Sequence, residues 1–173
     1  MISYENFPED VHCVAVFQHL NPRNVLQQAI FLAFHRLNSE ILDSSILTPY
    51  LRQNCRVGFE FGVAEGLDFN FLDQEELDKC LRIVDEKEVE LMDFLFVMKY
   101  HLIKSGGKLV PLRFDYHFLS FRFIENGLEL RVHHEKGTMR VSFDELIDFI
   151  IKEINIGLSD RMQFPLVLSK FVR

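Results

Sequence analysis

Three arginines, Arg122, Arg131 and Arg140, are spaced so that together they could bind an anion. Residues 117–141 alternate as β-strands do, and they contain Asn126-Gly127, a dipeptide typical of a two-residue hairpin turn. This turn and the next one place the three arginines opposite one another on three strands. Like charges in that position destabilise a sheet, and guanidinium groups bind phosphate well. The pattern predicts a bound anion, for example a phosphate-bearing small molecule, or alternatively a neighbouring acid that neutralises the row.

The charge distribution supports an anion near these arginines but disfavours a nucleic acid. Residues 108–140 carry six Lys or Arg against four Asp or Glu, within a chain of formal charge −7. Nucleic acids and anionic membranes bind positively charged protein surfaces, so this negative net charge argues against both as partners. An RNA-binding sheet is a second alternative, in which Phe118 stacks on a base while the arginines contact phosphates.

A carboxylate pair, Glu60 and Asp68, suggests acid–base chemistry. Residues 57–72 alternate in two runs around Ala64-Glu65-Gly66, which predicts a hairpin with a three-residue loop. That register pairs Phe61 with Phe69 and places both acids on the opposite face. The alternative is that these acids form the solvated side of an antiparallel sheet.

Histidines and cysteines do not show the spacing of a metal or nucleophile site. His133 and His134 are adjacent and should point to opposite faces of a strand, and no third ligand accompanies His12 and His19. The three cysteines form no CxxC motif, which predicts reduced, buried thiols. With no catalytic motif, we expect no metal, no cofactor and no catalytic residue of a known type.

Most of the remaining chain has a helical pattern. Segment 22–42 begins at Asn21-Pro22, a start signal, and has an apolar stripe so wide that little polar face remains. Segment 73–103 is one helix, or two broken near Asp85, and its end at 91–103 is apolar nearly all round. A further helix follows the capping box of Ser142 and Glu145. For 8–20 we prefer a helix, with a strand as the alternative.

These elements predict an α+β fold that is mainly helical, with two antiparallel elements at about 57–72 and 117–141 packed on helices. The length of 173 residues suits a single globular domain over 1–173. Residues 158–173 are apolar in places and form a possible docking tail. Neither a signal peptide nor a membrane-length apolar run occurs, which predicts a cytoplasmic protein without a membrane partner.

Eighteen Phe residues and the apolar helices at 22–42 and 91–103 predict self-association, most simply as a homodimer. The preferred function is a non-enzymatic binding or regulatory protein that self-associates and binds an anion on the arginine row. The alternative is a small-molecule or nucleotide-processing enzyme that uses this row together with Glu60 and Asp68.

Overall fold

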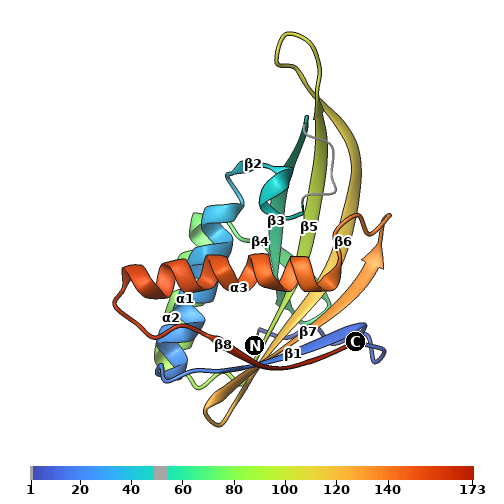
Figure 1. Cartoon of the computed structure of the whole chain (residues 1–173). Helices are drawn as coiled ribbons and strands as arrows, with labels where there is room; N and C mark the ends of the chain where they lie inside the picture. Colours follow the sequence, from blue (N-terminus) through green and yellow to red (C-terminus); the bar gives the residue numbers. More distant parts are fainter. Residues whose placement is uncertain (1, 49–53) are drawn as a thin grey trace.

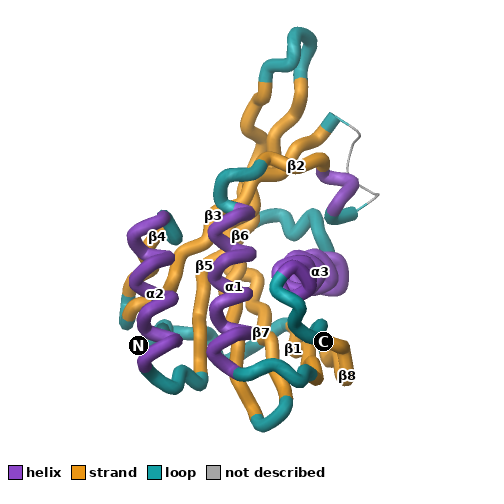
Figure 2. Tube along the Cα trace, turned by 90° about the vertical axis from the view of Figure 1, so that its left-hand side faces the viewer, coloured by secondary structure: helices purple, strands orange, loops and turns teal. Residues whose placement is uncertain are grey.

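The computed structural model describes residues 2–48 and 54–173, and in this part of the chain β-strands predominate. Eight strands form one antiparallel sheet, accompanied by three α-helices, so that 43% of the described residues are strand and 29% are helix. The expectation of a mainly helical protein is therefore wrong. The fold is a large twisted sheet with helices on one face (Figures 1 and 2).

The sheet has the order β2-β3-β5-β6-β7-β1-β8, and β4 pairs with β3 beside this path. The first strand of the chain therefore lies between the seventh and the eighth. The bounds of the strands are β1 (Cys13–Gln18), β2 (Ile41–Asp43), β3 (Cys55–Glu65), β4 (Asp68–Phe71), β5 (Leu91–Ile103), β6 (Leu109–Ile124), β7 (Gly127–Lys136) and β8 (Val167–Val172).

The helices are α1 (Arg23–Leu37), α2 (Gln74–Glu86) and α3 (Phe143–Asp160), and a short 3-10 helix, η1, spans Ser44–Ile46. Two predicted starts are confirmed. The side chain of Asp73 accepts the backbone N–H of Glu76, and Ser142 with Glu145 forms a complete capping box. The helix predicted over 22–42 ends earlier, at Leu37, because residues 41–43 pair with β3 as β2.

The core lies between the helices and one face of the sheet, which we call the inner face. Alternate residues of β5, from Met92 to Tyr100, point to this face and are at most 1% exposed. Phe34 of α1 stacks on Phe61 of β3, and Phe149 of α3 stacks on Phe59 of the same strand. Aromatic contacts of this kind account for many of the 18 Phe residues within one chain.

The opposite, outer face is partly covered by the N-terminal segment, residues 2–10. Tyr4 forms a β-bridge with Gly66, and its backbone N–H donates to the carboxylate of Asp93 at 2.8 Å. The ring of Tyr4 also contacts Phe69 and Phe118. This segment thus buries apolar side chains of the outer face without adding a strand to the sheet.

Segment 91–103, predicted as a central helix, is instead the strand β5. It lies between β3 and β6 and is packed on both faces, so that apolar residues occur at consecutive positions. A run of this kind has no clear period of two, which is the signal that separates strands from helices. Segment 8–20 is likewise not helical, and the strand alternative is correct over Cys13–Gln18.

The hairpin at 57–72 exists, but its predicted register is wrong. Glu65 pairs with Asp68 and Ala64 with Phe69, so the loop has two residues, Gly66 and Leu67, rather than three. This shift places Phe69 on the outer face, away from Phe61. The conformation at Gly66, with φ of +67°, suits glycine as expected.

Two segments extend the sheet. Residues 167–172, within the predicted docking tail, form the edge strand β8 against β1. The hairpin of β5 and β6 projects beyond the body, as Figure 1 shows at the top of the molecule. We call residues 99–114 of this hairpin the arm.

Candidate functional site

The predicted arginine row does not form. The turn after β6 is at Glu125-Asn126, so Ile124 pairs with Gly127, two residues away from the predicted register. Arg122 therefore lies opposite Glu129, and Arg131 lies opposite Ser120. The Nε of Arg131 donates to the Glu129 carboxylate, which favours the alternative of a neutralising acid.

Arg140 is not on a strand, because the chain turns away at Gly137. Its backbone N–H donates to the carboxylate of Asp115 at 3.3 Å, and its guanidinium lies 5.5 Å from the ring centre of Tyr100. The shift of two residues does preserve the faces of β6 and β7, so the predicted core-facing residues of these two strands are buried as expected: Leu119, Phe121, Phe123, Leu130 and Val132.

Glu60 and Asp68 do not form a carboxylate pair. Glu60 is on the outer face and forms an ion pair with Lys99 of β5. Asp68 pairs with Glu65. Because Glu65 is five residues from Glu60, an odd number, the two point to opposite faces of β3, and Asp68 lies on the same face as Glu65. Two acids on opposite faces of a sheet cannot act on one substrate atom.

Phe118 is not free to stack on a base. Its ring lies 5.3 Å from that of Tyr4, 5.6 Å from that of Phe69 and 6.2 Å from that of Phe7. The N-terminal segment therefore occupies the face on which an RNA base would bind.

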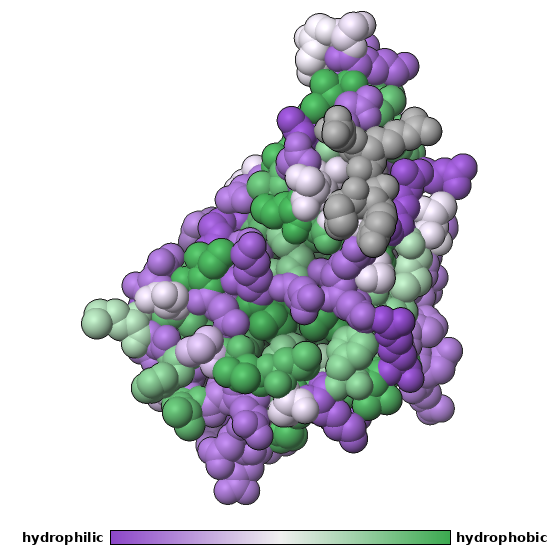
Figure 3. Space-filling model, viewed as in Figure 1, coloured by the Kyte–Doolittle hydropathy of each residue, from purple (hydrophilic) through white to green (hydrophobic). Residues whose placement is uncertain are grey.

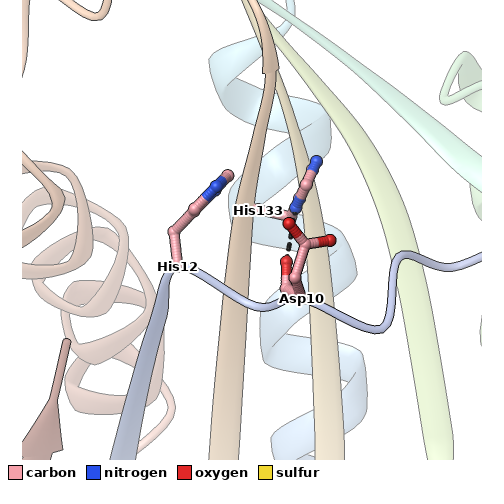
Figure 4. A group of neighbouring side chains, drawn as sticks. All are labelled: Asp10, His12 and His133. Atoms are coloured by element: carbon pink, nitrogen blue, oxygen red, sulfur yellow. Dashed lines mark hydrogen bonds between the residues drawn. The ribbon is translucent and has the colours of Figure 1, made fainter.

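A histidine pair that the sequence did not reveal lies where β1 meets β7. The rings of His12 and His133 are stacked with centres 4.4 Å apart, and Asp10 lies beside them (Figure 4). The potential ligand atoms of these three residues are all within 4.8 Å of one another. Since His12 and His133 are far apart in the sequence, only the pairing of β1 with β7 brings them together.

The polar contacts of this pair use the nitrogens that a metal would need. Nδ1 of His133 bonds to the carbonyl oxygen of Asp10 at 2.7 Å, and its Nε2 lies 3.2 Å from the carboxylate of Glu135. Nδ1 of His12 accepts the backbone N–H of His134 at 2.9 Å, so the proton of neutral His12 is on Nε2 and no free lone pair remains on that ring. Both imidazoles are therefore engaged with protein groups, and the cluster does not offer the three or four free protein ligands of a zinc site.

A second polar cluster is buried on the inner face around Asp115. Its carboxylate accepts the hydroxyl of Tyr100 at 3.0 Å and the backbone N–H of Met139 at 2.9 Å. Burial raises the pKa of Asp115, but these hydrogen bonds and that from Arg140 outweigh it and hold the pKa below its usual value. The cluster anchors the turn at 137–141 to β6, which is a structural role.

His117 lies next to this cluster, and neither of its ring nitrogens has a hydrogen-bond partner among the described residues. Burial lowers its pKa to about 4, so the ring is neutral at physiological pH. Asp115 and His117 are at most 1% exposed, and neither lines any of five cavities of the described chain. Both groups are therefore shielded from solvent.

The cysteines are free and buried, as expected, and two of them are poor nucleophiles. Burial raises the pKa of Cys13 to about 11 and that of Cys80 to about 12. The thiolate is the reactive form, and at neutral pH almost none is present at these positions.

An apolar groove of about 760 Å³ lies on the outer face, at the end of the sheet farthest from the arm. It is lined by β1, β8, the turn between β6 and β7, and the loop at Phe164-Pro165. Its apolar side chains include some of the most exposed in the protein: Leu20 (77%), Val167 (57%), Phe164 (56%) and Ile124 (47%). Figure 3 shows apolar surface gathered in the region of β8.

None of the helices in the described ranges is long and apolar enough to cross a membrane. No family model matches the chain, and neither a curated protein nor a solved structure matches it.

Proposed function

We propose that this chain is a non-enzymatic binding protein that acts as a homodimer, with β8 and the adjacent apolar groove at the interface. The observation that carries this proposal is an edge strand with apolar side chains exposed on both faces. β8 pairs with β1 on one side and ends the sheet on the other. Val167, Leu168 and Val172 of this strand are each 46% to 57% exposed.

An edge strand presents unpaired N–H and C=O groups that can pair with a second strand. Proteins that stay monomeric usually protect such edges with proline, bulges or several charges. The stretch of β8 from Val167 to Val172 has no proline and one charged residue, Lys170, although its pairing with β1 contains a bulge. Two copies of β8 related by a two-fold axis would extend one antiparallel sheet into the other.

The groove strengthens this proposal because it adjoins the strand. Val167 is part of both, so a partner that pairs with β8 would also cover the exposed rings and methyl groups of the groove. Isolated exposed apolar residues are common, but a contiguous group beside a free edge is typical of an interaction surface.

A free stretch elsewhere in the sheet has the protection that β8 lacks. Residues 109–114 of β6 precede the pairing of that strand with β7, and they contain Pro111, Arg113 and a bulge opposite β5. Proline and bulges prevent edge-to-edge association. We therefore place the interface at β8.

The enzymatic alternative has little support, because the groups proposed for it do not converge. Glu60 and Asp68 lie on opposite faces, and Asp115 and His117 are buried and do not line the apolar groove.

Light scattering across a concentration series tests the dimer. At tens of micromolar we expect a mass of twice the 20.4 kDa of one chain. The double variant Val167→Lys/Val172→Lys should be monomeric, because a two-fold axis brings the added charges of both copies together. The control Ile156→Lys adds a charge at a residue of similar exposure on α3, 42%, and should remain dimeric. A monomeric native protein, or equal effects of both variants, would contradict the proposal.

A further inference from the structure

The arm differs from the rest of the protein in charge. Residues 94–114 contain four Lys or Arg and no Asp or Glu, and the remaining chain carries 15 Lys or Arg against all 26 acids. An acidic body of formal charge −11 thus carries one basic projection. Because the arm carries cations and no acid, the average charge of the chain does not describe its surface.

The cations of the arm are exposed and lie near its tip. Lys104 and Lys108 flank a turn in which Gly106 and Gly107 both have positive φ, and Arg113 follows on β6. A side-chain atom added at either glycine would meet nothing within 4 Å, so no described residue packs on the turn at these two positions. The nearest pairing is that of the N–H of Ile103 with the carbonyl oxygen of Asn54. Lys99, at the base of the arm, is instead paired with Glu60.

The same stretch is strongly apolar. Leu109, Leu112 and Phe114 are 38%, 41% and 43% exposed, and Leu102, Ile103 and Val110 are partly exposed. Figure 3 shows apolar surface just below the tip. Leu109, Leu112 and Phe114 belong to β6, whose free edge is protected here by Pro111 and a bulge, so we expect side chains, rather than the backbone, to contact a partner.

We propose that the arm inserts into the interface of an anionic lipid membrane. Exposed apolar residues interleaved with Lys and Arg are the features that bind such surfaces, because the apolar groups enter the headgroup region while the cations contact lipid phosphates. A nucleic acid would contact the cations, but it would leave most of the apolar side chains in water.

The acids on the strands beside the arm do not prevent this contact, because they are paired with cations: Glu60 of β3 with Lys99, and Asp43 of β2 with Arg56. β3 itself pairs with β5 as far as Leu102. On the β6 side, seven residues, Leu109 to Asp115, precede the first pairing with β7 at Tyr116. At about 3.3 Å per residue they span roughly 23 Å, which exceeds the Debye length of about 8 Å at physiological ionic strength, so the charges of β7 and the elements beyond it are largely screened at the tip.

The proposed dimer interface does not compete with the arm. The groove includes Ile124, and β6 runs for 16 residues from Leu109 to this position. This corresponds to about 50 Å. Figure 1 shows the arm at the top of the molecule and the turn after β6 at the bottom. Membrane contact therefore does not depend on the proposed function.

The chain has no tryptophan, so a single introduced Trp can report on the arm. Leu112→Trp in the full chain should show a blue-shifted emission with vesicles containing about one third phosphatidylserine, and quenching by brominated lipid. No shift is expected with phosphatidylcholine alone. The control Leu20→Trp places the reporter in the groove, at a residue 77% exposed, and should show no shift with either vesicle.

Charge variants test the role of the cations. Each Lys or Arg near an anionic surface strengthens binding about fivefold, so Lys104→Gln/Lys108→Gln/Arg113→Gln should bind these vesicles about 100-fold more weakly. Lys87→Gln/Lys152→Gln/Arg161→Gln removes three exposed cations from the body and should bind like the native chain. The proposal is overturned if neither reporter shifts, if both triple variants weaken binding equally, or if a short DNA duplex binds at lower concentration than the vesicles.

Discussion

Phe34 of α1 and Phe61 of β3 are stacked face to face, with ring centres 4.0 Å apart and an angle of 14° between their planes. Phe96 of β5 also stacks on Phe61, with ring centres 4.6 Å apart. Both Phe34 and Phe61 have no exposed surface. This stack joins the buried face of α1 to β3 and β5 of the sheet.

Removing the central ring of this stack should be costly. We expect Phe61→Ala to lower the free energy of unfolding by about 3–5 kcal/mol, because it leaves a cavity beneath α1. Phe71→Ala, at a residue 53% exposed, should change it by about 0.5 kcal/mol or less. Urea denaturation measures both, and effects of equal size would show that the placement of β3 against α1 is wrong.

Two glycines should respond to alanine in opposite directions. At Gly137, with φ of +118°, an added Cβ would lie 2.1 Å from a carboxylate oxygen of Asp115. Gly137→Ala should therefore destabilise by about 2 kcal/mol or more, from backbone strain and the displaced carboxylate. Gly157 is inside α3 with nothing within 4 Å of an added Cβ, so Gly157→Ala should stabilise by about 0.5–1 kcal/mol. Thermal unfolding of the two variants separates these cases.

The buried His117 makes stability depend on pH. Burial lowers its pKa from 6.5 to about 4 in the folded state, so the unfolded chain binds this proton more readily. The stability that the buried neutral ring contributes is fully present above pH 6.5 and is lost as the pH falls through about 4. That loss is on the order of 3 kcal/mol.

The variant His117→Leu tests this linkage, since it removes the titrating group and keeps the site apolar. The free energy of unfolding, measured by urea at several pH values between about 7 and 4, should fall less steeply than in the native protein. Identical pH profiles would mean that other groups cause the dependence.

The ion pair of Arg131 with Glu129 determines what to expect from the predicted anion site. The side chains are 31% and 22% exposed, and such a pair contributes about 1 kcal/mol at most. Arg131→Met should therefore reduce stability by no more than this, and inorganic phosphate should not raise the melting temperature of the native chain. A phosphate-dependent shift that Arg131→Met abolishes would restore anion binding at this position.

Local sequence signals predicted ends and turns better than element types. Asp73 and Ser142 marked the starts of α2 and α3 because their caps depend on residues three positions away. A turn was correctly predicted in this region, but it lies one residue earlier, at Glu125-Asn126, since Asn126 itself adopts positive φ at 55° and Gly127 begins β7. That displacement separated the arginines of the predicted row.

Long-range arrangement was not predictable in the same way. β5 resembles a helix in its composition because neighbours on both sides and both faces bury it. Those neighbours are distant in sequence, so the order of residues within β5 does not indicate them. The contact of His12 with His133 depends on one strand pairing across most of the chain. The arm, by contrast, had a visible signal, since 94–114 is a run of 21 residues without an acid.

The position of β1 between β7 and β8 has a consequence for synthesis. When Gln18 leaves the ribosome, its partner Gly127 has not been made, and 108 residues must follow first. At about 5–20 residues per second, β1 remains without a partner for roughly 5–20 seconds. During that time an apolar strand is exposed to other nascent chains, and its pairing must wait for the slow closure of a very long loop. The nascent protein is therefore a natural client for a chaperone that binds short extended apolar segments.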